Sequence, residues 1–322
     1  MNANPNLATQ YLGLSLRSPL VVSASPMAED IRRIIEMENS GAGAVILPSL
    51  FEDPGHPPTV DPAAYARRIT EAKEYVALPL IATLSAASLD SWIAGAVRME
   101  QAGADALELN IYNLTLSPEI PSSQLEQSYL EIAAAVVQAV KIPVAVKLSP
   151  YFTNLARLSL QLQQVGVKGL VMFNRFYQSD VDLGGRELTA SSHLSSPSEN
   201  LLPRHWIALL YRMLNLDLAA NTGFHTGADA LKAVLCGASV VEVCSVLLQR
   251  GISWLVVMEN ELREAMQQSG LASLDEARGR LSRAIEPSIG EIERSEYRKT
   301  LKSFSQLEVP TWLDEVPLHL AP

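Results

Sequence analysis

A single lysine stands near the end of a strongly apolar segment, where a charge is unexpected. In the segment PVAVKLS, the alternation of a β-strand puts Ala145 and Lys147 on the same face. Burying an ammonium group costs free energy unless a partner neutralises it. Two roles for Lys147 follow: it forms an ion pair with Glu108 or Glu242, or it holds an anionic cofactor or reaction intermediate.

Further polar residues stand at the ends of other apolar segments. They are Asn110, Asn113, Asn174, Arg175, Thr222, Gly223, Cys244 and Ser245. A glycine beside small hydroxyl residues is typical of a phosphate site, but also of an ordinary turn. Arg175 has two interpretations: a bidentate contact with a carboxylate or phosphate, or a salt bridge to Asp180 or Asp182. Cys244 lies in an apolar segment and is more typical of a core residue than of a nucleophile.

The elements that position these residues repeat along the chain. Short segments rich in Val, Ile and Leu alternate with amphipathic stretches, as a parallel sheet covered by helices requires. Eight such pairs predict an α/β fold of the TIM (β/α)8 barrel type, with an open doubly wound sheet as the alternative. The eight expected strands lie within residues 19–25, 43–49, 79–85, 106–112, 143–149, 169–175, 217–223 and 240–246.

The helices and long connections complete this organisation. One helix is expected to begin at Ala28, and another runs from an N-cap at Ser88 to Gly103. Long loops are expected at residues 113–121 and 176–202, on the catalytic face of a barrel. We predict a barrel domain over residues 1–289. The charged segment 290–322 is then a C-terminal extension that packs on the barrel or mediates self-association, for example in a homodimer.

Composition excludes several classes of protein. The chain has 322 residues, of which 48% are hydrophobic, so it can bury a large core. Its net charge of −10, without a basic run, argues against a nucleic-acid partner. Two cysteines cannot form a disulfide framework, and the five histidines show no metal-ligand spacing. No apolar run is long enough to span a membrane and no secretory signal precedes the first strand, so a cytoplasmic protein is expected.

The order of several short segments resembles the FMN-dependent dihydroorotate dehydrogenase family. The resemblance covers about residues 8–275 and begins with a segment similar to that family's N-terminal hairpin and first strand. The segments are LATQYLGLSLRSPLVVSAS, LELN (107–110), VKLSPYF (146–152), FNR (173–175), NTGFHTGADA (221–230) and LCGASVVEV (235–243).

This resemblance implies an FMN cofactor on top of the barrel and assigns residues to it. Lys147 matches the lysine that contacts the flavin pyrimidine edge, while Asn110 and Asn174 match asparagines that hold flavin and substrate. The other implied cofactor residues are Ala24, Ser25, Ser49, Thr222, Gly223, Cys244 and Ser245. Of the phosphate-site glycines only Gly223 is kept, because Thr222 and Cys244 replace its neighbours.

The segment after the fourth strand departs from the family pattern. The family has a Cys or Ser there that removes a proton from dihydroorotate, whereas this chain has Asn113, with Thr115 two residues on. An amide cannot accept that proton near neutral pH. Arg175 replaces a small hydroxyl residue and, with Asn113 and Thr115, is expected to face a small anionic substrate.

Two function classes follow. The first is an FMN-dependent oxidoreductase of CH–CH donors, acting on dihydroorotate or a related anion in pyrimidine biosynthesis. The second is a barrel that has lost the catalytic base and binds flavin or another ligand without turnover.

Overall fold

The computed structural model describes residues 4–52, 60–113, 117–175, 179–190, 193–283 and 289–304. Its internal contacts divide the chain into two compact units, Met1–Arg283 and Ala284–Pro322. The first unit holds all the residues singled out above. In the second unit the structure describes one helix, α11 (Ile289–Phe304).

The first unit is a closed barrel of eight parallel strands, as predicted. Neighbours are hydrogen-bonded around the whole ring, which closes because β3 pairs with β13 and β4 pairs with β6. The barrel strands are β3 (Leu20–Val22), β4 (Ala44–Ile46), β6 (Leu80–Ala86), β7 (Ala106–Asn110), β8 (Val144–Leu148), β9 (Gly169–Met172), β12 (Asp217–Asn221) and β13 (Val240–Val243). Each lies in its expected window, except that β6 ends one residue later.

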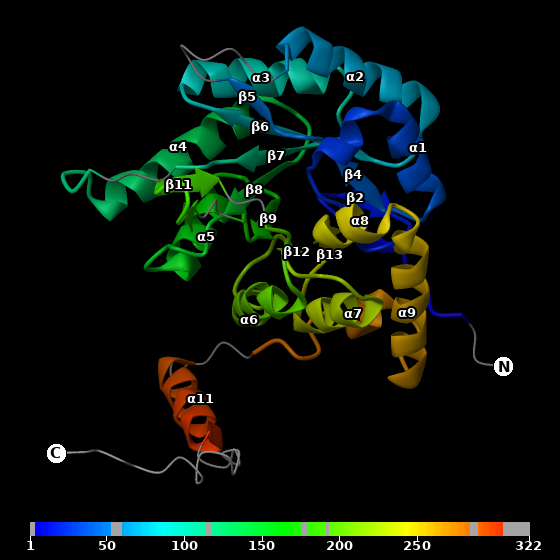
Figure 1. The fold of residues 1–322 in the computed structure, drawn as a ribbon, viewed down its shortest axis with the longest axis vertical. Helices are drawn as coiled ribbons and strands as arrows, with labels where there is room; N and C mark the ends of the chain where they lie inside the picture. Colours follow the sequence, from blue (N-terminus) through cyan, green and yellow to red (C-terminus); the bar gives the residue numbers. More distant parts are fainter. Residues whose placement is uncertain are drawn as a thin grey trace. The chain divides into compact units, whose positions relative to one another are not determined.

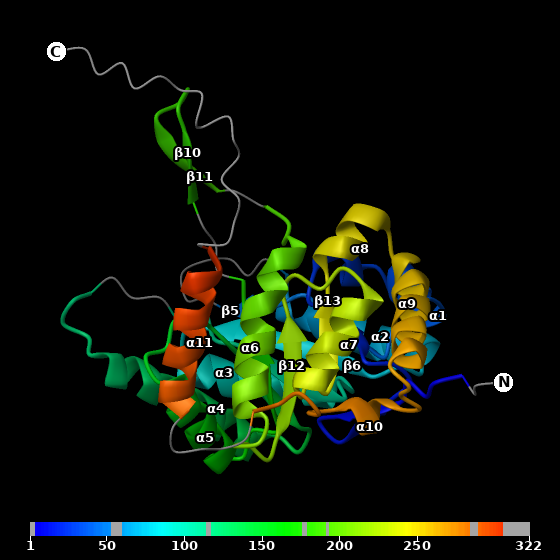
Figure 2. The same ribbon diagram turned by 90° about the horizontal axis from the view of Figure 1, so that it is seen from below.

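Helices surround this barrel (Figure 1). They are α1 (Ile31–Asn39), α2 (Pro62–Tyr75), α3 (Leu89–Gln101), α4 (Ser122–Ala139), α5 (Leu155–Gln164), α6 (Leu201–Leu210), α7 (Gly227–Cys236), α8 (Ser245–Arg250), α9 (Trp254–Gln268) and α10 (Leu274–Ala277). The expected N-cap at Ser88 is present, since its side chain accepts a hydrogen bond from the Ser91 N–H. In Figure 2, α7 lies beside α9, with which it makes extensive contacts.

One expected helix start is wrong. The segment from Ala28 is not continuous α-helix: a 3-10 turn, η1 (Pro26–Glu29), comes first, and α1 begins only at Ile31. The Asp30 side chain accepts a hydrogen bond from the Arg32 N–H. This N-cap satisfies a donor that the first helical turn leaves free, and it fixes the start of α1.

The alternation along each strand separates two cores. Leu20, Val22, Val45 and other outward residues pack under the helices, whereas the inward residues form a separate cluster inside the barrel. That inner cluster is apolar and comprises Tyr11, Leu12, Leu16, Val21, Ala44, Ile46, Ile81, Ala106, Ala145, Val171, Ala219 and Val240. We call this cluster the lower layer of the barrel interior.

An N-terminal hairpin closes the amino-terminal end of the barrel, as the resemblance implied. Its strands are β1 (Thr9–Tyr11) and β2 (Leu14–Leu16), joined by Leu12 and Gly13, both with positive φ. Two-residue hairpin turns require such backbone angles. The Leu12 N–H donates to Asp217 Oδ2 at 2.7 Å, which ties the turn to the start of β12.

The connections after the strands contain structure that the sequence analysis did not predict. Strand β5 (Leu50–Glu52) pairs with the end of β6. Within the expected loop 176–202, β10 (Ser179–Asp182) and β11 (Glu187–Ala190) form an antiparallel hairpin, followed by a 3-10 turn, η2 (Pro197–Asn200). The exposed Gly184-Gly185 between these strands is a turn signal that could have indicated the hairpin.

Candidate active site

Above the lower layer, the inward side chains change from apolar to polar. Because successive residues of a strand alternate between its faces, these side chains come two residues after lower-layer positions. They are all buried and comprise Ser23, Thr83, Glu108, Lys147 and Glu242. They form what we call the upper layer, next to the carboxyl ends of the strands.

Lys147 lies at the centre of a buried ionic cluster. Its Nζ is 3.2 Å from Glu108 Oε1 and 3.0 Å from Glu242 Oε2. Ser23 Oγ also donates to Glu242 Oε2, at 3.0 Å. Lys147 thus pairs with both of the acids that the sequence offered as alternatives. We call Glu108, Lys147 and Glu242 the ionic cluster.

The charges within this cluster shift its protonation equilibria. Burial alone would lower the pKa of Lys147, but the two carboxylates outweigh that effect and raise it, so the ammonium stays charged. Burial and the nearby charge of Glu242 raise the pKa of Glu108 to about 8, although Lys147 opposes this shift.

A hydrogen-bonded row crosses the barrel mouth. Asn110 Nδ2 donates to Ser49 Oγ at 3.2 Å, and Asn174 Nδ2 donates to Asn110 Oδ1 at 2.6 Å. Asn110 is the last residue of β7, while Ser49 and Asn174 follow β4 and β9, which is why residues far apart in sequence meet here. The row fixes the orientation of both amides and leaves them half-buried at the mouth.

A cavity of about 230 Å³ opens at this face and brings together most of the predicted site. Lys147 and Glu242 reach it from the upper layer. The predicted residues along its wall are Ala24, Lys147, Asn174, Arg175, Thr222, Gly223, Cys244 and Ser245, and the others are Ser23, Leu194, Ser195, Asn221, Phe224 and Glu242. A second recess of about 310 Å³ adjoins it, with Tyr151 and Leu202 in its wall, and shares Asn174 and Arg175 with the cavity.

One corner of the cavity is built around Ser195, which the sequence analysis missed. Its hydroxyl contacts Ser245 Oγ at 2.9 Å and accepts from the Gly223 N–H at 3.3 Å. The backbone of η2 approaches Gly223 so closely that an added Cβ would lie 2.4 Å from the Asn200 nitrogen. Gly223 has φ +83, and Thr222 beside it has φ 81, a left-handed conformation that costs a threonine free energy.

Two side chains fix the backbone just before Asn174. Asn221 Nδ2 donates to the Phe173 carbonyl at 2.9 Å, and Thr222 Oγ1 donates to the same oxygen at 3.2 Å. Asn221 was not singled out from the sequence, although it begins the NTGFH segment. Its role in the structure is to join the ends of β9 and β12.

Arg175 has a different partner from either expected salt bridge. Its Nε lies 3.3 Å from Glu199 Oε1, in η2, rather than against Asp180 or Asp182. Those aspartates belong to the β10–β11 hairpin, where Asp182 instead accepts from the backbone of the Gly184-Gly185 turn. The Arg175 side chain is 41% exposed and lies in the walls of both recesses.

The position expected for the catalytic base, Asn113, is not among the described residues that line either recess. Asn113 is exposed, and its Nδ2 donates to Ser128 Oγ of α4 at 3.4 Å. This contact directs the amide toward the helix that follows the loop. Thr115 lies outside the described residues, so its predicted place near the substrate stays a prediction.

The two cysteines do not have the environment of a nucleophile. Burial raises the pKa of the Cys244 thiol, although the nearby Ser25 hydroxyl and the charge of Lys147 oppose the shift. Burial likewise raises the pKa of Cys236, which packs on the helix-covered core. Both thiols are therefore protonated at neutral pH, which weakens them as nucleophiles.

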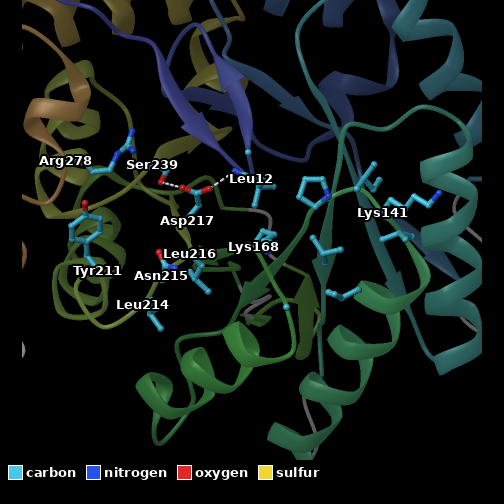
Figure 3. A pocket seen from close by; sticks show the side chains of 17 residues that line it. Leu12, Lys141, Lys168, Tyr211, Leu214, Asn215, Leu216, Asp217, Ser239 and Arg278 are labelled. Carbon is cyan, nitrogen blue, oxygen red and sulfur yellow. Dashed lines mark hydrogen bonds between the residues drawn. The ribbon is translucent and has the colours of Figure 1, made fainter.

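A larger cavity lies at the opposite, amino-terminal face (Figure 3). It has a volume of about 780 Å³, and Leu12, Lys168, Tyr211 and Arg278 are among the residues in its wall. Asp217 is held there by the Leu12 N–H and by Ser239 Oγ at 2.6 Å. This face carries the hairpin that closes the barrel, and conserved chemistry in such barrels sits at the other end.

Two features are absent from the described part of the chain. It holds no group of three His, Cys, Asp or Glu side chains placed to bind a metal ion. Nor do its helices include one with the length and apolar character needed to cross a membrane.

The fold and this cavity define a class of protein: a (β/α)8 barrel with a polar cavity at the carboxyl ends of its strands. Comparison with family models adds the family. The model described as "Dihydroorotate dehydrogenase" matches residues 51–266, which is most of the chain. The chain therefore belongs to the dihydroorotate dehydrogenase family, as its segments indicated.

Curated relatives agree with this family over most of the chain. The chain is 26% identical to the catalytic subunit of dihydroorotate dehydrogenase B (NAD(+)) of Methanocella arvoryzae, over 74% of this chain and 85% of the relative. It is 24% identical to dihydroorotate dehydrogenase A (fumarate) of Lactiplantibacillus plantarum, over 83% of this chain and 96% of the relative. The names of these two relatives differ in the electron acceptor.

Proposed function

We propose that this protein is an FMN-dependent oxidoreductase acting on a small anionic substrate, related in structure to dihydroorotate. The observation that carries the proposal is the row Ser49–Asn110–Asn174 beside Lys147 at one mouth of a barrel of this family. The row and the lysine present amide and ammonium groups of the kind that recognise the polar edge of a flavin ring.

The residues present fit FMN at both ends of the group. Asn110, Asn174 and Lys147 would hold the ring. The Gly223 N–H and the Ser245 hydroxyl would hold the phosphate, because small hydroxyls and backbone donors after the last two strands suit a phosphate. Both of these groups now contact Ser195, so the Ser195 hydroxyl would have to turn away or join them as a third donor. Ala24, Ser25, Thr222 and Cys244 complete the proposed cofactor site.

Arg175 is the residue we propose for the substrate anion. It lies in the walls of both the cavity and the adjoining recess, and its guanidinium is only half-buried. Within the described residues Arg175 contacts Glu199 through Nε, and the other N–H groups of its guanidinium are the ones we propose for a carboxylate. FMN supplies the hydride acceptor when it is bound, while Arg175 orients the substrate.

We propose that dihydroorotate itself is oxidised slowly. Removal of a proton from that substrate needs a base, and the Asn113 amide has no basic site near neutral pH. General-base catalysis contributes roughly 10²–10⁴-fold to a rate, so its loss leaves a weak activity. Because Asn113 lacks a basic site, it also favours the second candidate, a ligand-binding barrel without turnover.

FMN binding to the purified full-length protein tests the proposal. We expect the protein to release FMN on denaturation, or to quench added FMN with 1:1 stoichiometry. A protein that neither contains nor binds FMN contradicts the proposal. If FMN binds, anaerobic mixing with dihydroorotate separates the two candidates: slow bleaching of the flavin supports an oxidoreductase, and no bleaching by dihydroorotate or related anions supports the binding barrel.

A further inference from the structure

The ionic cluster contains one cation and two carboxyl groups. Glu108 and Glu242 are 1% and 2% exposed, and both contact the same ammonium of Lys147. If both carboxyl groups were ionised, the cluster would carry a net negative charge inside the barrel. An uncompensated charge at such a depth is strongly unfavourable, so the cluster must either take up a proton or destabilise the fold.

The hydrogen bonding of the two acids also indicates a missing proton. Glu108 Oε2 and Glu242 Oε1 are buried, and neither has a hydrogen-bond partner in the described structure. Ionised carboxylates only accept hydrogen bonds, so two of them cannot satisfy each other. The two side chains are held together by the same Lys147 ammonium, and one proton on either acid would supply a donor that the pair lacks.

The other titratable groups described near the pair, Tyr11, Tyr65 and Cys244, are neutral and do not remove the need for this proton. Tyr11 faces it from β1 and Tyr65 from α2, and burial raises the pKa of both phenols, so they stay neutral. Among the described residues, Lys147 is the only positive charge that acts on Glu108.

We propose that Glu108 and Glu242 share one proton, and that Glu242 exchanges it with a nitrogen heterocycle bound against Lys147. Glu242 and Lys147 both line the cavity, whereas Glu108 lies behind them. In the exchange, a carboxyl O–H bond breaks and an N–H bond forms on the ligand. The cluster becomes negative as the ligand gains one positive charge, and no electrons are transferred. The exchange rests on the proposed function, in which the heterocycle is FMN, whereas the shared proton does not.

The shared proton makes a prediction for the ligand-free protein. An unfolded glutamate titrates near pH 4.5, whereas burial raises the pKa of folded Glu108 to about 8. Between these values the folded chain holds a proton that the unfolded chain lacks, so stability falls as pH rises. This site alone should increase the unfolding equilibrium constant about tenfold per pH unit.

Denaturant titrations from about pH 5 to pH 8 test this prediction in the full chain. In Glu108→Gln, the remaining Lys147–Glu242 pair is neutral without a proton. The variant should therefore lack the rise of about tenfold per pH unit that this site adds to the unfolding constant of the wild type. Parallel profiles for the two proteins would overturn the shared proton.

Glu259 provides a matched control, because it is also a buried carboxylate but faces two cations. It pairs with Arg263 and lies 3.8 Å from Arg17. Glu259→Gln should keep the wild-type pH slope, and an equal flattening in this variant would also overturn the proposal. If Glu108→Gln does not fold, infrared spectroscopy of the wild type decides: a protonated carboxyl band at neutral pH is expected, and its absence refutes the shared proton.

The exchange with the ligand has its own test, with FMN as the probe. When the reduction potential of bound FMN is followed against pH, the wild type should show a break where the cluster titrates. Glu242→Gln should remove that break, and a wild-type plot without one overturns the exchange. A protein that binds no FMN but retains the expected stability profile would contradict the proposed function and leave the shared proton supported.

Discussion

The two halves of the barrel interior are made of opposite kinds of side chain. The lower layer is wholly apolar apart from the Tyr11 hydroxyl, with residues such as Val21, Ile46 and Ile81 filling it. The upper layer, only two residues further along the same strands, contains Glu108 and Lys147 as well as Glu242. The change from one to the other occurs within single strands, for example from Ala145 to Lys147.

This difference indicates that the lower layer contributes mainly to the stability of the barrel, whereas the upper layer contributes little to it. Each fully buried aliphatic side chain of the lower layer contributes about 1.5–3 kcal/mol. A buried ion pair offers little net stability compared with apolar residues of similar size, because desolvation offsets the attraction. An ionic cluster at the carboxyl ends of the strands is thus better explained by function than by stability.

The largest expected effect comes from removing the cation of the upper layer. Lys147→Met keeps the volume but leaves two buried carboxyl groups without a counter-charge, so we expect a loss of about 3–5 kcal/mol in the free energy of unfolding at neutral pH. Urea denaturation measures it, and the loss should shrink in acid, where both carboxyl groups are protonated. Lys73→Met, which breaks a partly exposed pair with Asp105, is the control and should cost about 1 kcal/mol or less. Equal losses in the two variants would show that the buried ionic cluster responds to loss of its cation no more strongly than a partly exposed ion pair does.

A truncation in the lower layer should also destabilise, but without affecting the site. Ile81 is 1% exposed and lies among apolar neighbours, so Ile81→Ala should cost about 2–5 kcal/mol. FMN affinity, measured below the unfolding transition, should remain that of the wild type. Ile81→Val is the milder companion, at about 0.5–1.5 kcal/mol. A loss of FMN affinity in the valine variant would show that the two layers are not independent.

The smallest expected effect on stability is at the rim. Arg175→Ala removes a half-exposed contact with Glu199, so the unfolding free energy should change by about 1 kcal/mol or less. Binding of orotate, followed by its perturbation of the FMN spectrum, should weaken about tenfold or more because a charge-assisted contact is lost. Glu199→Gln keeps the arginine and should bind orotate at least as well as the wild type. Equal weakening in both variants would assign the effect to loop structure.

The barrel could be predicted from the sequence because its strands are continuous apolar segments of regular spacing. The β10–β11 hairpin escaped prediction because residues 179–188 are exposed and largely polar, so no hydrophobic pattern marks it. The start of α1 was misplaced for a local reason: acidic residues occur at both Glu29 and Asp30, and only the backbone geometry shows that Asp30 is the cap.

The site could be predicted in part, because strand ends in a parallel barrel converge on one face. The pairing of Lys147 with Glu108 and Glu242 was foreseen as an alternative, but a sequence carries no distances that could favour it. Ser195 and Glu199 were not foreseen as site residues. Both come from the connection after β9, and only its path in three dimensions brings them to Gly223 and Arg175.

The closure of the barrel through β3 and β13 has a consequence for how the chain is made. Val22 of β3 pairs with Val243 of β13. The first barrel strand therefore cannot complete its pairing until most of the chain has been synthesised. Until then β3 exposes an unpaired apolar edge, a hazard for association with other chains. Contacts between such distant residues also slow folding, since a long loop must close before they form. A truncated chain that ends before β13 should therefore be a poor folder and a client for chaperones during synthesis.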